Sequence, residues 1–92
     1  MSNEINDGWI TAQDKLDDLK AIVRAGMPWI DEDELLIGIY FYALNYYIGQ
    51  GDLLYKVTCL IDFRFSGSEE SVLKDLPDAA EAIDLLERHF SR

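Results

Sequence analysis

The amino-acid sequence predicts a mainly α-helical protein, a small bundle of four to five helices. Its 92 residues are enough for one hydrophobic core and too few for two. Apolar residues recur at the spacing of a helix that buries one face. Capping residues precede these segments, and glycine or proline follows several of them. We therefore expect residues 1–8 to form a flexible N-terminus and residues 9–92 a single helical domain.

The first helix is predicted to begin at Thr11. Its side chain can cap a helix, and Asp14 then lies near the positive end of the helix dipole. Gly26, followed by Pro28, supplies the stop. The residues of its apolar face are Ala12, Leu16, Leu19, Ile22 and Val23. The acids of the opposite face are Asp14, Asp17 and Asp18.

The second helix has the clearest start signal, in the acidic run of residues 31–34. Asp31 can cap the helix and Glu34 can reach back to it, while Ile30 and Leu35 can form a hydrophobic staple. Residues 35–48 are apolar around nearly the whole helix circumference, so most of this surface must be covered. The sequence therefore places this helix at the centre of the domain or at an interface.

Residues 52–65 fit two interpretations. As a helix, the segment has a capping Asp52 and a stop at Gly67. As a strand, it alternates apolar and other residues from Tyr55 to Phe65. A strand needs a partner, and residues 35–48 have helix signals instead. We favour the helix, and the alternative is an α+β fold with a hairpin over residues 37–65.

The C-terminal part is predicted to hold a helix from about Ser68 and another from Pro77. Proline disfavours a helical conformation in the preceding residue but suits the first position of a helix. Glu81, Asp84 and Arg88 should face water, with Asp84 and Arg88 spaced as an ion pair. The residues expected on the buried face are Ala79, Ala82, Ile83, Leu86 and Phe90.

The charge of the chain excludes two classes of partner. Eighteen acids against eight bases give a net charge of −10, which opposes direct binding to nucleic acid or to an anionic membrane. The longest apolar stretch, residues 35–48, is too short to cross a bilayer. The first residues lack the pattern of a signal peptide, and Cys59 has no second cysteine to bond. We expect a cytoplasmic protein.

Catalytic chemistry has little support in the sequence. His89 is the only histidine, and it is remote in sequence from Cys59. Asp31 and Asp33 match the first ligands of a calcium loop, but leucines follow where more ligands are required. There is no glycine-rich phosphate-binding loop. We therefore expect no catalytic residue, no metal and no cofactor, and we do not expect an enzyme.

The acids are concentrated toward the two ends of the chain. Residues 1–34 carry a net charge of −6, residues 35–66 are neutral and residues 67–92 carry −4. Such a field accelerates association with a basic protein. The leading hypothesis is an inhibitor whose carboxylates take the place of nucleic-acid phosphates on a basic target. The acids expected to contact the target are Asp14, Asp17, Asp18, Asp31, Glu32, Asp33, Glu34, Glu81 and Asp84.

The neutral middle segment holds eight of the eleven aromatic residues. Tyrosine hydroxyls must find a partner or reach water, so some of these rings should lie at the surface. Surface tyrosine and tryptophan often anchor interfaces. The alternative hypothesis is therefore a homo-oligomeric structural or adaptor module, for example a dimer. The aromatic residues expected at this interface or at a partner interface are Trp29, Tyr42, Tyr46 and Tyr47.

One short string resembles a known family. Residues 52–55 (Asp-Leu-Leu-Tyr) are similar to the first four positions of the Asp-Leu-Ile-Tyr-Tyr-Pro string of the small acidic four-helix immunity proteins of nuclease bacteriocins. The likeness covers these four residues and ends at Lys56 and Val57. The resemblance implies a helical inhibitor of a nuclease, which matches the size and acidity of this chain.

Overall fold

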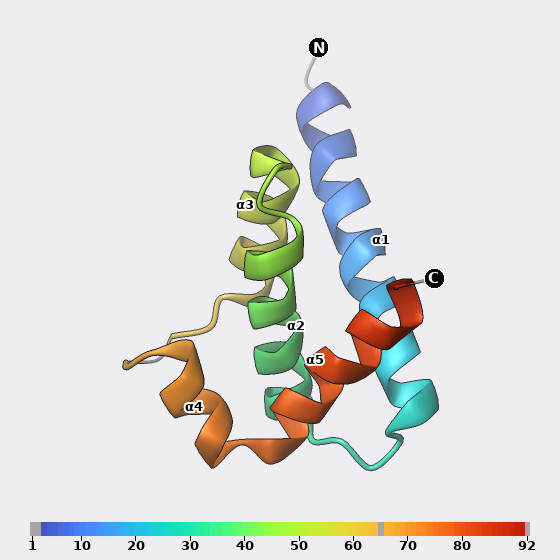
Figure 1. The fold of residues 1–92 in the computed structure, drawn as a ribbon. Coiled ribbons are helices and arrows are strands. Elements are labelled where there is room, and N and C mark those ends of the chain that lie inside the picture. The colour runs from blue at the N-terminus through green and yellow to red at the C-terminus, as the bar shows by residue number, and fades with distance from the viewer. Residues whose placement is uncertain (1–2, 65, 92) are drawn as a thin grey trace.

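The structure, a computed structural model, describes residues 3–64 and 66–91, with side chains described from Gly8 onward. Five helices and no strand occur in these residues, which confirms the helical bundle (Figure 1). The helices are α1 (Asn3–Gly26), α2 (Glu32–Tyr46), α3 (Gly51–Ile61), α4 (Glu69–Asp75) and α5 (Pro77–Phe90). The alternative hairpin over residues 37–65 is wrong, because α2 and α3 occupy most of its described residues and no strand occurs among them.

Helix α1 begins earlier than predicted. It starts at Asn3, so the expected cap at Thr11 is wrong and Thr11 lies inside the helix. Trp9 gives the added turns a packing partner, because its ring meets Tyr55 of α3 edge-on at 6.5 Å. Residues 3–8 of the segment expected to be flexible are helical, and residues 1 and 2 lie outside the described residues. The end at Gly26 is confirmed.

Helix α2 begins as predicted. The Asp31 carboxylate accepts a hydrogen bond from the Asp33 backbone N–H at 3.1 Å, and Ile30 and Leu35 are both buried. The return bond expected from Glu34 is absent, since its buried Oε2 has no hydrogen-bond partner. Asp31 alone therefore caps the helix through its side chain.

Removal of the Asp31 cap is expected to destabilise the protein measurably. Replacing Asp31 with alanine should lower the free energy of unfolding by about 1 kcal/mol, because the Asp33 N–H loses its acceptor. Urea unfolding followed by circular dichroism measures the change. The control is Asp31→Ser, which can still cap and should keep most of the stability. Equal losses in both variants would contradict the capping role.

The helical interpretation of residues 52–65 is confirmed by α3. Val57 and Ile61, four residues apart, are buried, whereas Tyr55 and Cys59 are exposed. Helix α3 ends at Ile61, before the predicted stop at Gly67, because Asp62 adopts a left-handed conformation with φ of 49°. Phe65, the last residue of the predicted alternation, lies outside the described residues.

The two C-terminal helices confirm their predicted starts. The Ser68 hydroxyl caps α4 by accepting from the Ser71 backbone N–H at 3.1 Å, and Pro77 opens α5. The expected buried face of α5 is confirmed except at Phe90, which is 50% exposed because the last turn extends beyond the core. The expected ion pair is not formed, since Arg88 Nε donates to the backbone carbonyl of Asp84 at 3.3 Å.

Helix α2 lies at the centre of the bundle, as its all-round apolar sequence predicts (Figure 1). Helices α1, α3 and α5 all pack against it. Helix α5 lies close to α2 at Gly38, where a Cβ atom would lie 2.9 Å from the carbonyl oxygen of Ala79 and 3.1 Å from the Ala82 Cβ. The largest fully buried side chains are Phe41, Leu19, Met27, Leu35, Ile39, Leu86, Val23 and Val57.

Candidate functional site

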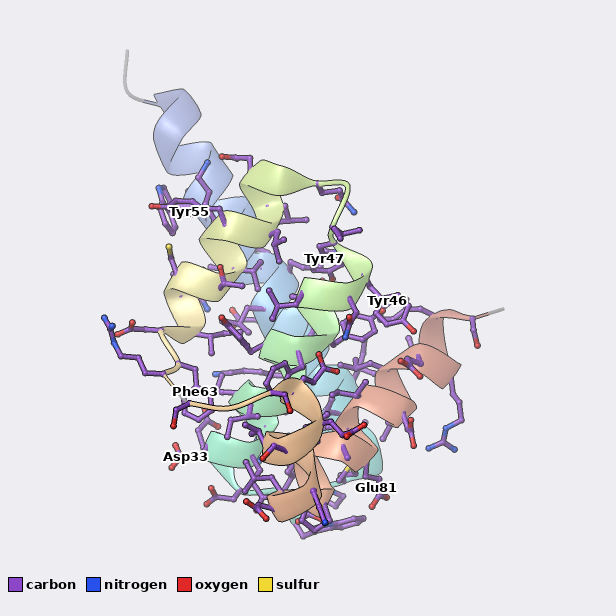
Figure 2. All side chains as sticks on the ribbon, turned by 60° about the vertical axis from the view of Figure 1, so that its left-hand side comes forward. Asp33, Tyr46, Tyr47, Tyr55, Phe63 and Glu81 are labelled. Carbon is purple, nitrogen blue, oxygen red and sulfur yellow. The ribbon has the colours of Figure 1, made fainter. Side chains whose placement is uncertain are left out.

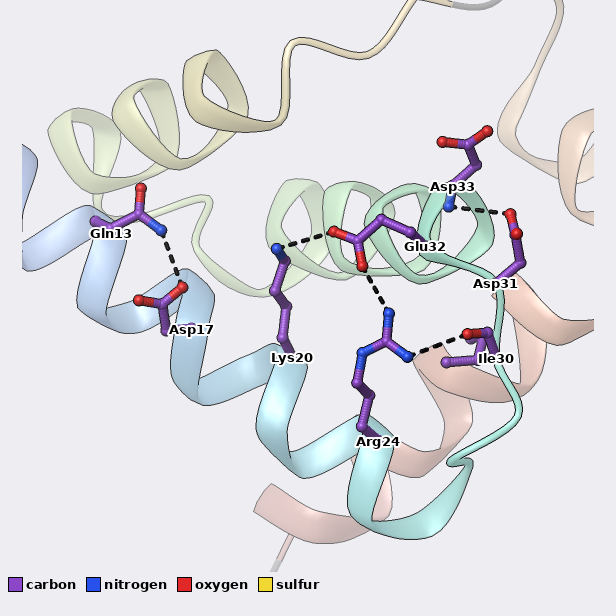
Figure 3. Close-up of polar contacts among 8 residues, drawn as sticks. All are labelled: Gln13, Asp17, Lys20, Arg24, Ile30, Asp31, Glu32 and Asp33. Carbon is purple, nitrogen blue, oxygen red and sulfur yellow. Dashed lines mark hydrogen bonds and ion pairs between the residues drawn. The ribbon is translucent and has the colours of Figure 1, made fainter.

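The exposed acid Glu32 is paired with two cations of α1 at the protein surface. Its carboxylate accepts from Lys20 Nζ at 3.0 Å and from the Arg24 guanidinium at 2.6 Å (Figure 3). Arg24 also donates to the backbone carbonyl of Ile30 at 3.2 Å. The hydrogen bond from Lys20, and then that from Arg24, lower the pKa of Glu32. This network joins α1 to the start of α2 and balances the charge of one predicted binding residue.

The three acids of α1 lie on the face opposite its buried stripe, as predicted. Asp14, Asp17 and Asp18 are exposed, and none of them forms an ion pair with another described residue. Asp17 accepts a hydrogen bond from the Gln13 amide at 2.9 Å (Figure 3). This face therefore presents three negative charges to solvent, and none of them is held in an ion pair among the described residues.

The remaining predicted acids come from two other helices. Asp33, in the first turn of α2, and Glu81, on α5, both lie toward the lower end of the molecule in Figure 2. Both are exposed, as are Asp31 and Asp84, while Glu34 is half-buried. The predicted acids are thus distributed over α1, the start of α2 and the outer face of α5.

The predicted aromatic residues fall into two places. Trp29 is 62% exposed in the turn between α1 and α2. Tyr42, Tyr46 and Tyr47 come together at the C-terminal end of α2, where the Tyr42 and Tyr46 rings stack at 4.7 Å and Tyr47 meets Tyr42 edge-on at 6.1 Å. Of these three, Tyr42 and Tyr47 are buried and only Tyr46 is an exposed surface residue.

A shallow groove lies beside this aromatic cluster, between α2 and the end of α5. Its volume is about 420 Å³, and its lining residues are Tyr42, Tyr46, Glu87, Arg88, Phe90 and Ser91. The Tyr46 hydroxyl donates to Glu87 Oε2 at 2.7 Å, and this bond raises the pKa of Tyr46. The Phe90 ring lies 6.3 Å from that of Tyr42. We name these six residues the tyrosine groove.

Four residues of the tyrosine groove were not among the predicted site residues: Glu87, Arg88, Phe90 and Ser91. Phe90 continues the apolar spacing of α5 and was therefore expected in the core. Glu87 lies 41 residues from Tyr46 in the chain. No local pattern joins Glu87 or Phe90 to the tyrosines of α2, since these contacts depend on how α5 packs along α2. The useful signal was the number of tyrosines, which is too large for all of them to be buried.

Burial of Tyr47 predicts a loss of stability in alkali. Desolvation, with smaller contributions from Tyr42 and Asp18, raises its pKa from 10.0 to about 12. The neutral form therefore stabilises the fold below pH 10, and this stabilisation is lost as the pH rises toward about 12. Tyr47→Phe should lose less stability than the unmodified protein between these pH values. Urea unfolding over this range measures the difference, and equal slopes would contradict the prediction.

No reactive cluster is found among the described residues. None of their His, Cys, Asp and Glu side chains form a group of three that could hold a metal ion. Cys59 lies beside Tyr55 on α3, whereas His89 meets Phe90 edge-on at 4.8 Å on α5.

No described helix is both long and apolar enough to cross a membrane. No family model matches the chain, and no curated protein or solved structure is significantly similar to it.

Proposed function

We propose that this protein is an acidic inhibitor, of the immunity type, that binds a basic nucleic-acid-processing protein in the cytoplasm. One observation carries the proposal: most of the carboxylates in the described part of the chain form no ion pair. Among the described residues, ion pairs involve only the carboxylates of Glu32 and Asp52. The net charge of −10 is therefore largely available to a partner.

We propose that the exposed acids of α1 contact the basic target. Asp14, Asp17 and Asp18 project from one helical face, as phosphates project along a nucleic-acid strand. Charges within about 8–10 Å of each other act together at physiological salt. A basic groove that binds nucleic acid would meet this face with complementary potential, and its association rate would fall as salt increases.

Affinity capture from the native host tests this function. The unmodified protein is compared with an α1 variant in which Asp14, Asp17 and Asp18 are all changed to Asn. A matched control carries Asp62→Asn, Glu70→Gln and Asp75→Asn, which remove the same charge from exposed positions outside the predicted site. We expect capture of a basic protein whose nucleic-acid binding is inhibited, with capture reduced only by the α1 variant.

The opposing outcomes of this capture experiment are distinct. If both triple variants lose capture equally, the interaction is ion exchange with a negative body, which contradicts a site on α1. If the captured protein binds nucleic acid equally well in the presence and absence of this protein, inhibition by mimicry is wrong. An association rate unaffected by salt would also contradict electrostatic steering.

A homo-oligomeric module is the second candidate function, and the exposed rings of Tyr46 and Phe90 favour it. Each is 50% exposed, and both line the same groove. The repulsion between two chains of net charge −10 opposes this association. Mass measurement at micromolar concentration decides the question: a dimer that dissociates on Tyr46→Glu supports the module, and a monomer contradicts it.

A further inference from the structure

The tyrosine groove has the chemistry of a site for a single cationic side chain. We propose that it binds an arginine of the basic target, an inference that rests on the proposed function and adds an anchoring residue to it. Exposed aromatic surface, a carboxylate and a concave shape occur together here. The acids of α1 would attract the target, and the groove would fix its position.

The ring of Tyr46 provides the stacking surface. It stacks on the buried Tyr42 with an interplanar angle of 20°, while half of its own surface remains exposed. Guanidinium groups stack on aromatic faces, and a ring already held by a neighbour loses little freedom when it binds. Tyr42 thus orients Tyr46 without occupying the exposed part of its ring.

Glu87 provides the charge at the edge of the same ring. Its Oε2 accepts the Tyr46 hydroxyl at 2.7 Å, and its Oε1 has no hydrogen-bond partner among the described residues. A guanidinium stacked on Tyr46 would lie close enough to this carboxylate to donate to it. Arginine combines stacking with directed hydrogen bonds, whereas the compact ammonium of lysine does not.

Charge favours this occupant over a second copy of the chain. A second copy would bring another ten negative charges, whereas a basic protein brings opposite charge. Arg88 is the one cation among the groove residues, and its Nε is held by the carbonyl of Asp84. Its positive charge opposes an incoming arginine, so Arg88→Gln should strengthen binding.

The peptide acetyl-Gly-Arg-Gly-amide is the probe for this site. Its binding to the full chain is followed by NMR shifts of the tyrosine ring protons, with acetyl-Gly-Lys-Gly-amide for comparison. We expect saturable shifts centred on Tyr46, and weaker binding of the lysine peptide. Tyr46→Leu and Glu87→Gln should each weaken binding about two- to tenfold.

Matched controls separate the groove from general charge and exposure. Tyr55→Leu removes an exposed tyrosine from α3, on the other side of the molecule from Tyr46 (Figure 2), and should change binding by less than about twofold. Glu70→Gln removes an exposed acid from α4 and should act likewise. Tyr46→Phe keeps the ring and should retain most of the binding, which tests the site even if Tyr46→Leu fails to fold.

Three results would overturn the inference. The first is no saturable peptide binding, and the second is an equal loss of peptide affinity in the control variants. The third is a dimer mass in solution with shifts at Tyr46 that follow dimer formation and not peptide binding. Failure of the inference is distinguishable from failure of the proposed function. If the host target is captured equally by Tyr46→Leu and by the unmodified protein, the groove is not the anchor although the inhibitor proposal stands. If the peptide binds but no basic protein is captured, the proposed function fails instead.

Discussion

Replacing Phe41 with alanine is expected to lower the free energy of unfolding by about 3–5 kcal/mol. Phe41 is only 2% exposed and is one of the largest fully buried side chains of the central helix α2. Its removal loses apolar burial and leaves a cavity that the surrounding helices fill only in part. Domains of this size are stable by about 5–15 kcal/mol, so much of the total would be lost. Urea unfolding followed by circular dichroism measures it.

The matched control for Phe41 is the same substitution at Phe90. Phe90 is 50% exposed at the end of α5, so Phe90→Ala should cost less than about 1.5 kcal/mol. If the two variants lose equal stability, the core does not lie where the structure places it. If Phe90→Ala is the more destabilising, the tyrosine groove is a part of the core and is not a surface.

Replacing Gly38 with alanine is expected to lower the free energy of unfolding by about 1–3 kcal/mol. Alanine is normally the better helix residue, and in an open position it would be stabilising. Here the added Cβ would lie 2.9 Å from the carbonyl oxygen of Ala79, a backbone atom that cannot move unless α5 moves. Overpacking between α2 and α5 therefore outweighs the gain in helix propensity.

Gly51→Ala is the matched control for Gly38. It lies in the first turn of α3, and a Cβ atom there would meet no atom within 4 Å other than those of its chain neighbours and its own helix backbone. It should be neutral or slightly stabilising in the same urea experiment. A stabilising Gly38→Ala would show that α2 and α5 are not in close contact.

Three helix starts could be predicted from local residues. Asp31 and Ser68 accept hydrogen bonds from backbone N–H groups of the first turn, and Pro77 suits the first helical position because its φ is fixed and it has no N–H to satisfy. The expected cap at Asp52 is wrong, since α3 begins at Gly51 and Asp52 lies in its first turn.

The start of α1 could not be predicted in this way. The turns that precede Thr11 include Trp9, which packs on Tyr55 of α3, and no local pattern shows this contact between distant segments.

The candidate sites could likewise be predicted only where local helical spacing determines them. The outward face of α1 follows from helical spacing, so Asp14, Asp17 and Asp18 were placed correctly on the surface. The tyrosines were expected as a group, yet spacing could not show that Tyr47 is buried and Tyr46 exposed. Glu32 was predicted to contact the target, and its pairing could not be foreseen because Lys20 and Arg24 belong to the preceding helix. Long-range packing decided each of these points.

The close approach at Gly38 has a consequence for the shape of the groove. Helices α2 and α5 lie close together at Gly38, and their ribbons diverge toward the C-terminal end of α5, so the pair resembles a wedge (Figure 1). In a wedge, a small displacement at the narrow end changes the aperture at the wide end. A larger side chain at Gly38 would therefore widen the groove between Tyr46 and Phe90, although Gly38 lies about two helical turns from Tyr46 and does not line the groove.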